Sequence, residues 1–341
     1  MKRSIFWPTR SFRLRFRAPE RFVANPVMSQ QIDPAISTLE STYKARDVEG
    51  LLDLFFYRKV GFQLARLCAR LKLTPVTVTV LGGICGIYAG HLYFYRDLRT
   101  NILGMFLHVL ANLLDNVDGQ LARLQNQKSR TGRVIDSVFD HLIFLSIYVH
   151  LALRCWFEGA SLPVIALLAL AAGLSHGLQG AAADYFRNAY LFFVQGRARS
   201  DWDSTKTLKE EYRQLSWRRE PWKKLMLALY IQFTWQQELL SPRLRRLRDL
   251  AERAFPNEVP DNLRQHYRGN ARPMLRGWGL LMTNTRMFFL FLFLILDQPA
   301  WFFWMEITVL NLLLAFLIFR QENMSDSLVK DIDYATLVNV D

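Results

Sequence analysis

Long apolar runs constrain this chain more than any other feature. A helix needs about 20 apolar residues to cross the hydrocarbon layer of a bilayer. Six stretches of the sequence meet that length: residues 75–95, 101–123, 134–153, 162–183, 277–296 and 299–319. We therefore expect an all-α integral membrane protein with six transmembrane helices.

Two further segments have a helical character of their own. In residues 48–72, Arg58, Arg66 and Arg70 recur on one side against Leu and Phe on the other, which predicts an amphipathic helix in the membrane interface. The polar stretch 187–276 contains a short apolar run, 225–233, that cannot span. This stretch predicts a helical cytoplasmic insert resting on anionic headgroups. The expected divisions are a basic tail at 1–47, the interfacial helix and first four spans at 48–186, the insert at 187–276, the last two spans at 277–319 and a second tail at 320–341.

The charge distribution predicts the orientation of the spans. The formal net charge is +13, which favours anionic partners such as headgroups or nucleotides. Lys and Arg are concentrated in the N-terminal tail, the 123–133 link and the insert, and such residues mark the cytoplasmic side. We expect both termini to be cytoplasmic, although Arg96 and Arg99 lie in a link predicted outside. The first 30 residues lack the apolar core of a cleavable signal.

Other broad classes of protein find little support. The three cysteines, Cys68, Cys85 and Cys155, are scattered without CxxC spacing, so they suggest neither a disulfide framework nor a zinc site. No stretch of the chain resembles a recognised nucleic-acid-binding motif. We expect no nucleic acid among the partners.

Four carboxylates stand at the facing ends of the second and third expected spans. Asp115 and Asp118 lie near the inner end of one span, and Asp136 and Asp140 enter the next. Residues three or four apart share a helix face, so two antiparallel helices can direct all four carboxylates into one cleft. Oxygen ligands without Cys or a nearby His pair favour Mg²⁺ or Mn²⁺, and two such ions suit a phosphoryl displacement.

Small residues and one cation accompany these carboxylates. Gly119 and Ala122 lie one turn beyond the first pair, and Gly132 lies one turn before Asp136. Side chains this small let a nucleotide approach the helix backbone. Arg123 adds a permanent positive charge for a diphosphate. If these residues only formed a polar link between two helices, their eight positions would not need a fixed spacing.

These eight residues form the pattern D-x2-D-G-x2-A-R-x8-G-x3-D-x3-D, and the chain thereby resembles the CDP-alcohol phosphotransferase family. The resemblance runs from Leu73 through the sixth span and includes Thr74-Pro75 at the entry to the first. Many members have Asn after that pair, where this chain has Val76, and compact members lack the long insert.

The resemblance implies a particular chemistry and site. It implies two metal ions held by Asp115, Asp118, Asp136 and Asp140, and a cytidine diphosphate cradled by Gly119, Ala122, Arg123 and Gly132. Asp140 would also be the general base that activates an alcohol, with release of CMP. The partners implied are a CDP-activated donor, an alcohol acceptor and membrane lipids, and members are commonly homodimers.

Several alternatives stay open at this point. Six spans favour CDP-diacylglycerol as the donor and a polar alcohol as the acceptor, while choline and ethanolamine phosphotransferases usually have more spans. An intramembrane prenyltransferase also uses DxxD carboxylates, but its motifs lie far apart in sequence. A cation transporter or membrane scaffold would bind metal without turnover, yet it gives no reason for the glycines and Arg123.

Polar residues in the later spans are weaker candidates. The fourth span offers residues that could line the acceptor side of the cavity: Ser175, His176, Gln179, Asp184, Tyr185, Arg187 and Asn188. For His176 a hydrogen bond between helices is the better interpretation. Arg286 either reaches the interface or contacts an anionic substrate, and with Arg187 it suggests a phosphorylated or inositol-like acceptor. Glu306 and Asn311 suggest contacts between helices.

Overall fold

The structure is a computed structural model, and it describes residues 46–48, 50, 53–127, 130–196, 200, 202–255 and 258–338. These residues are helical, with no strand among them, as the sequence predicts. The expected N-terminal tail, apart from its last two residues, lies outside the described part. Before the first long helix come the 3₁₀-helix η3 (Arg46–Val48), the π-helix η4 (Asp53–Tyr57) and α1 (Arg58–Arg70).

Five segments of the described residues are long and apolar enough to cross a membrane. They are Pro75–Leu92, Gly132–Phe157, Leu162–Gln195, Asp261–Ile295 and Ala300–Lys330. The helices within them are α2 (Pro75–Leu92), α4 (Arg130–Phe157), α5 (Leu162–Gln195), α9 (Asp261–Leu280), α10 (Thr283–Ile295), α11 (Ala300–Met305), the π-helix η6 (Glu306–Leu310) and α12 (Asn311–Val338). The protein is thus a multi-pass membrane protein.

The second expected span is not among these five. Its residues form α3 (Leu98–Leu124), which is long enough at 27 residues to cross a bilayer. Polar residues such as His108, Asn112 and Asp115 interrupt its apolar sequence. The count of six spans therefore stays a prediction, while the helix itself is present.

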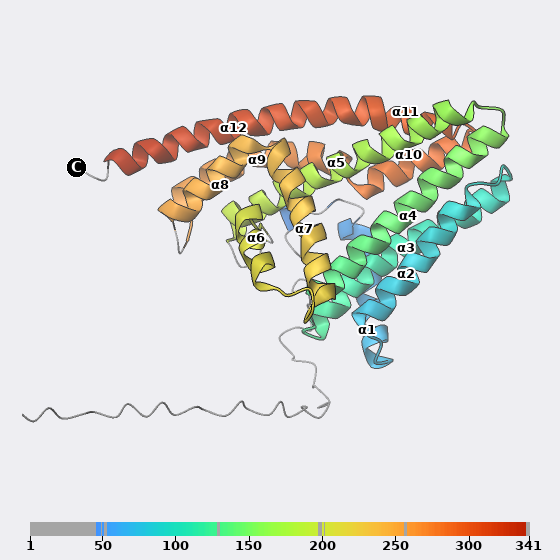
Figure 1. Cartoon of the computed structure of the whole chain (residues 1–341), viewed down its shortest axis with the longest axis horizontal. Coiled ribbons are helices and arrows are strands. Elements are labelled where there is room, and N and C mark those ends of the chain that lie inside the picture. Colours follow the sequence, from blue (N-terminus) through green and yellow to red (C-terminus); the bar gives the residue numbers. More distant parts are fainter. Residues whose placement is uncertain are drawn as a thin grey trace, which may run out of the picture.

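A glycine face on α2 allows α3 and α4 to pack closely against it, as the three adjacent helices in Figure 1 show. A Cβ added at Gly83 would lie 2.1 Å from Cδ1 of Phe139 on α4. A Cβ at Gly90 would lie 2.8 Å from the backbone nitrogen of Ile147, an atom that cannot rotate away. Larger residues at these positions would separate the helices that carry the carboxylates. Thr74 caps α2, since its side chain accepts a hydrogen bond from the Thr77 amide at 3.2 Å.

Ion pairs tie together three short links at one end of the bundle. Arg154, at the end of α4, lies 2.5 Å from Asp297 and 3.1 Å from Glu158, and Arg96 lies 2.8 Å from Asp297. The hydrogen bond from Arg96 lowers the pKa of Asp297, and the bond from Arg154 adds to the effect. The links that precede α3, α5 and α11 therefore meet at the same end, and the carboxylates of interest lie toward the other.

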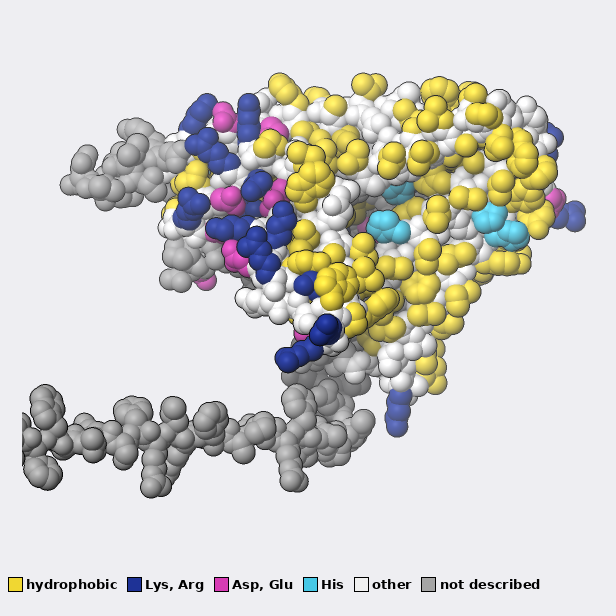
Figure 2. Space-filling view, viewed as in Figure 1, with side chains coloured by type: hydrophobic (Ala, Val, Ile, Leu, Met, Phe, Trp, Pro, Cys, Tyr) yellow, Lys and Arg dark blue, Asp and Glu magenta, His cyan; other side chains and the backbone are white. Residues whose placement is uncertain are grey.

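The insert is helical, as expected. It comprises α6 (Thr205–Gln214), α7 (Pro221–Leu240), α8 (Pro242–Ala254) and most of α9, which begins the candidate membrane segment Asp261–Ile295, and the polar end of α12 packs against α8. Figure 2 shows Lys and Arg side chains gathered at this end, and hydrophobic side chains covering much of the surface that is visible elsewhere. A buried ion pair at 2.8 Å joins Glu238 of α7 to Arg248 of α8.

The amphipathic segment forms η4 and α1, which pack against α3. Arg66 and Arg70 are exposed, but Arg58 is 9% exposed and belongs to the buried face with Gly61 and Phe62. The expectation that Arg58, Arg66 and Arg70 share one side of the helix, against Leu and Phe on the other, is therefore wrong for Arg58. Its position at the start of the helix places it against the end of α3 instead.

Candidate active site

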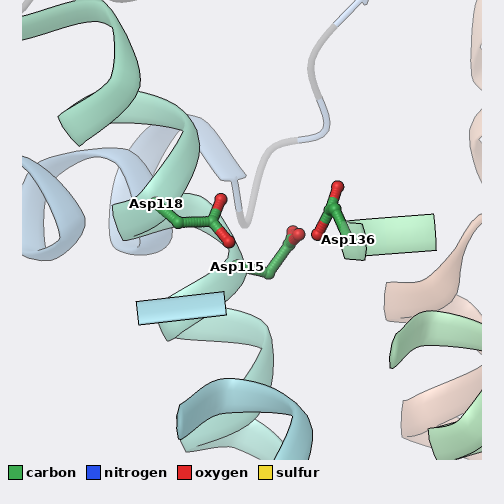
Figure 3. A group of neighbouring side chains, drawn as sticks. All are labelled: Asp115, Asp118 and Asp136. Atoms are coloured by element: carbon green, nitrogen blue, oxygen red, sulfur yellow. The ribbon is translucent and has the colours of Figure 1, made fainter. Parts of the chain in front are cut away.

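Two helices bring three carboxylates together. Asp115 and Asp118 project from α3, and Asp136 projects from α4, as Figure 3 shows. One oxygen from each of these side chains lies within 4.8 Å of the others. The spacing of three in α3 places both of its carboxylates on the face toward α4. The glycine face of α2, which packs against both helices, sets the distance between them.

The fourth predicted carboxylate is near but separate. Asp140 lies one turn after Asp136 and lines the same cavity, of about 80 Å³, but it is not part of the group of three. The cavity is lined mainly by α2, α3 and α4, with Thr283 contributed by α10. Asp140 thus faces the space beside the carboxylate cluster, where a second reactant could lie.

The chemistry of this donor set fits a hard divalent cation. The cluster offers only carboxylate oxygens, which are the ligands that Mg²⁺ and Mn²⁺ prefer. Asp118 is 7% exposed, whereas Asp115 is exposed and Asp136 half-buried, and like charges at this separation repel one another. A bound cation would relieve that repulsion.

Thr79 supports the cluster, and the sequence analysis did not identify it. Its hydroxyl lies 2.5 Å from Oδ2 of Asp118 and 3.0 Å from the carbonyl of Pro75. A hydroxyl has one hydrogen, and the shorter distance indicates that Asp118 receives it. The local sequence, Val-Thr-Val-Thr-Val at 76–80, gives no signal that separates Thr79 from Thr77.

Amide side chains extend the polar region toward η4. Asn112 donates to Asn284 of α10 at 3.1 Å, and Asn284 donates to Asp53 of η4 at 3.1 Å. Asn112 lies one turn before Asp115 and lines the cavity. Its place on the carboxylate face of the helix was a usable signal in the sequence.

The residues expected to cradle a nucleotide lie on the last turns of α3 and the first turn of α4. A Cβ added at Gly119 would meet only Nη1 of Arg123, at 4.0 Å, so the helix surface there is open. Gln125 donates to the carbonyl of Leu73 at 3.0 Å and holds the end of α3 against the start of α2. Gly119, Ala122, Arg123 and Gly132 therefore surround the link between the two helices that carry the carboxylates.

Arg286 belongs to a buried network between helices. It is 3% exposed, pairs with Glu306 at 2.9 Å and donates to Gln179 at 2.5 Å. Gln179 donates to Asn311 at 2.8 Å, and Asn311 donates to Ser175 at 2.9 Å. The expectation that Glu306 and Asn311 make contacts between helices is met. Arg286 neither reaches the interface nor lines the carboxylate cavity.

The remaining candidates of the fourth span also make contacts within the protein. Nδ1 of His176 lies 3.1 Å from the hydroxyl of Tyr148, which agrees with a packing role. Arg187 and Asn188 donate to Asp184 at 2.5 and 3.1 Å. None of these residues lines the cavity that contains the carboxylates.

Comparisons with known proteins match the segment that carries the motif. The family model for CDP-alcohol phosphatidyltransferase matches residues 72–188. A bifunctional IPC transferase and DIPP synthase of Thermococcus kodakarensis is 28% identical over 142 residues, or 42% of this chain and 31% of that protein.

Two further relatives are similar over shorter stretches. A phosphatidylinositol phosphate synthase of Streptomyces avermitilis is 32% identical over 122 residues, 35% of this chain and 48% of its own length. An archaetidylinositol phosphate synthase of Pyrococcus horikoshii is 30% identical over 91 residues, 27% of this chain and 47% of its own length.

The chain thus spans between about a third and a half of the curated relatives it matches. The matched segment begins just before α2 and extends into α5, so it contains the carboxylates, the glycines and Arg123. The resemblance to the CDP-alcohol phosphatidyltransferase family, which the motif predicts, is thus confirmed for the segment 72–188.

Proposed function

We propose that this protein transfers a phosphate-linked group from a CDP-activated donor to an alcohol in phospholipid synthesis. The observation that carries the proposal is the cluster of Asp115, Asp118 and Asp136 beside a cavity that Asp140 also lines. The family of the matched segment and the synthase names of its relatives support it.

The proposed step uses this chain's own residues as follows. Asp140 takes the proton of the acceptor hydroxyl, and the oxygen attacks the donor phosphorus. The bond from that phosphorus to the bridging oxygen of the diphosphate breaks, and CMP leaves. When bound, Mg²⁺ or Mn²⁺ held by Asp115, Asp118 and Asp136, with Asp140 adjoining, would neutralise charge on the diphosphate. Gly119, Ala122 and Gly132 admit the nucleotide, and Arg123 adds a positive charge beside it.

We propose CDP-diacylglycerol or a related CDP-lipid as the donor and a polar alcohol as the acceptor. Two relatives are named as synthases of inositol phosphate lipids, which makes inositol phosphate and inositol the acceptors of first choice. The support comes from these names, because Arg286 and Arg187, which suggested an anionic acceptor, pair with Glu306 and Asp184.

We further propose that the protein associates as a homodimer. We also propose an orientation in which the cytoplasm contains both termini, the insert and the open side of the carboxylate cavity. The basic insert supports this orientation. A cysteine introduced at Ser204 should then react from the cytoplasmic side alone. Labelling from the opposite side would refute the orientation.

The deciding experiment supplies purified protein with Mn²⁺ and either CDP-diacylglycerol or CDP-choline, each with a panel of acceptors. CMP release reports any productive pair, and a radiolabel in each half of the donor tells which half is transferred. Product from CDP-choline and diacylglycerol alone would reverse the proposed direction. Folded protein that binds Mn²⁺ and releases no CMP from either donor would favour a cation transporter or scaffold.

A further inference from the structure

Helix α7 of the insert exposes an apolar face that no described helix covers. Five of its large apolar side chains are between 39% and 63% exposed: Trp222, Leu225, Leu229, Trp235 and Leu239. At about 100° per residue, these positions fall within an arc of about 140°. The amides Gln232 and Gln236 share this arc, and it contains no charged residue.

The opposite face of α7 is fixed to the rest of the protein. Leu227, Thr234, Gln237 and Glu238 are buried there. Gln237 donates at 3.2 Å to both the Ala181 carbonyl and Asp184 of α5. The exposed arc is therefore held in a defined direction, and its exposure does not come from a loosely placed helix.

The contact with α5 gives the level of α7 relative to the bilayer. The large apolar side chains that α5 exposes are Leu162, Val164, Leu167, Leu170, Leu174 and Leu178. Beyond Leu178 the described part of α5 exposes none, and Gln237 attaches within two turns of that point. Figure 2 shows hydrophobic side chains over α7 that adjoin those over α4, with basic side chains beside them. α7 thus lies where the lipid-facing surface of the bundle ends.

The charges around α7 suit a negatively charged surface. Arg218, Arg219, Lys223 and Lys224 are located at its N-terminal end. Nζ of Lys224 lies 5.8 Å from the ring centre of Trp217, which is 52% exposed. Tryptophan rings are enriched at the depth of the headgroups, and nearby cations attract anionic lipids.

We propose that the exposed face of α7 is immersed in an anionic leaflet, on the side of the membrane where the carboxylate cluster lies. Helices of this kind sink about 5–10 Å into the boundary between headgroups and acyl chains. The insert is then a membrane-bound element beside the catalytic segment, held by α7 and not by charge alone. This inference does not depend on the reaction that the carboxylates carry out.

The experiment places one fluorescent label at a time in the full chain, with Cys68, Cys85 and Cys155 replaced by serine. The test positions are Leu229→Cys and Trp235→Cys. In nanodiscs of phosphatidylcholine and phosphatidylglycerol, quenching by lipids with a spin label near the headgroup is compared with quenching by aqueous iodide. Retained Mn²⁺ binding serves as the check of folding.

Two control positions calibrate the result. Leu174→Cys, on the exposed face of α5, reports lipid, and Lys209→Cys, exposed on α6, reports water. We expect both test labels to be quenched by the lipids severalfold more than the Lys209 label, and by iodide severalfold less. In nanodiscs of phosphatidylcholine alone, iodide quenching at Leu229 should rise severalfold.

Three results would overturn the proposal. Iodide quenching at both test positions equal to that at Lys209 would show a solvated face. Protection from iodide and from lipid together would show a protein cover, such as a second copy of the chain. Equal iodide quenching at Leu229 in the two lipid mixtures would rule out the preference for anionic lipid.

Discussion

Thr79→Val tests whether the Thr79 hydroxyl orients the Asp118 carboxylate for binding a cation. The substitution keeps the shape of the side chain and removes the hydroxyl that lies 2.5 Å from Oδ2 of Asp118. Both residues are buried, so water does not readily replace the lost hydrogen bond. Asp118 would then be free to turn away from Asp115 and Asp136, and the metal would have to restore its position.

The size of the effect follows from the type of bond. A hydrogen bond to a charged group contributes about 1.5–3 kcal/mol, and loss of a group that orients a metal ligand costs about 10–100-fold in affinity or activity. We therefore expect Mn²⁺ affinity to fall by about 10–100-fold. At saturating Mn²⁺, much of the activity should return, because Thr79 orients a ligand and does not contact the reacting atoms.

The assay is a Mn²⁺ titration followed by calorimetry and by CMP release. The matched control is Thr77→Val on the same helix, since Thr77 is exposed and its hydroxyl forms a hydrogen bond with the cap residue Thr74, at 2.8 Å, and not with the cluster. The control should bind Mn²⁺ like the unmodified protein. Equal Mn²⁺ affinity in the Thr79 variant and the unmodified protein would refute the orienting role.

Three other substitutions test separate parts of the structure. Asp140→Asn should retain binding of the CDP donor and lose turnover, because it removes the proposed base; near-normal CMP release would exclude that role. Gly90→Ala should destabilise the protein by about 1–3 kcal/mol in a denaturant titration, because its Cβ meets the Ile147 backbone, whereas Gly177→Ala, in open space, should not destabilise it. Glu238→Gln should weaken the insert by less than the cost of an uncompensated buried charge, about 3–5 kcal/mol, because Arg248 loses its buried partner but keeps the more exposed Asp249 at 3.2 Å; proteolysis rates would measure this.

The Glu238 pair also predicts a pH dependence. Burial raises the pKa of this carboxyl, but hydrogen bonds from Arg248 and the Thr205 amide outweigh burial, and the pKa lies below its ordinary 4.5. A lowered pKa in the folded state stabilises the insert fully above 4.5, and this stabilisation is lost as the pH falls through the lower value. Glu238→Gln should remove this part of the acid sensitivity.

The spacing of the carboxylates was enough to predict that Asp115, Asp118 and Asp136 meet, whereas Asp140 lines the same cavity outside their group. Positions three or four apart on a helix share a face whatever the rest of the fold does, and the short link at 125–129 keeps the facing ends of α3 and α4 together on α2. Thr79 was not predictable in this way. Its partner Asp118 is 39 residues away, and which of two threonines faces it depends on how α2 is rotated against α3.

Arg286 shows what the sequence could not predict. From sequence alone, Arg286 looked available to a substrate because it begins an apolar helix. Its partner, Glu306, comes from the next membrane segment, and their 2.9 Å contact is a property of tertiary packing. A carboxylate in an apolar segment is therefore ambiguous from sequence: it can join a cluster of carboxylates, as in α3, or neutralise an arginine, as at Glu306.

The same residues explain why α3 falls short as a candidate span and why it carries the site. His108, Asn112, Asp115 and Asp118 reduce its hydropathy, and all four line the cavity. Such side chains are costly against lipid, so the helix that bears them must be shielded by others. α3 packs against α1, α2, η4 and α10, whereas α5 exposes a row of leucines. Hydropathy therefore underrates a helix such as α3, which exposes Ile102, Leu103 and Phe106 but directs its carboxylates toward a cavity among its neighbours.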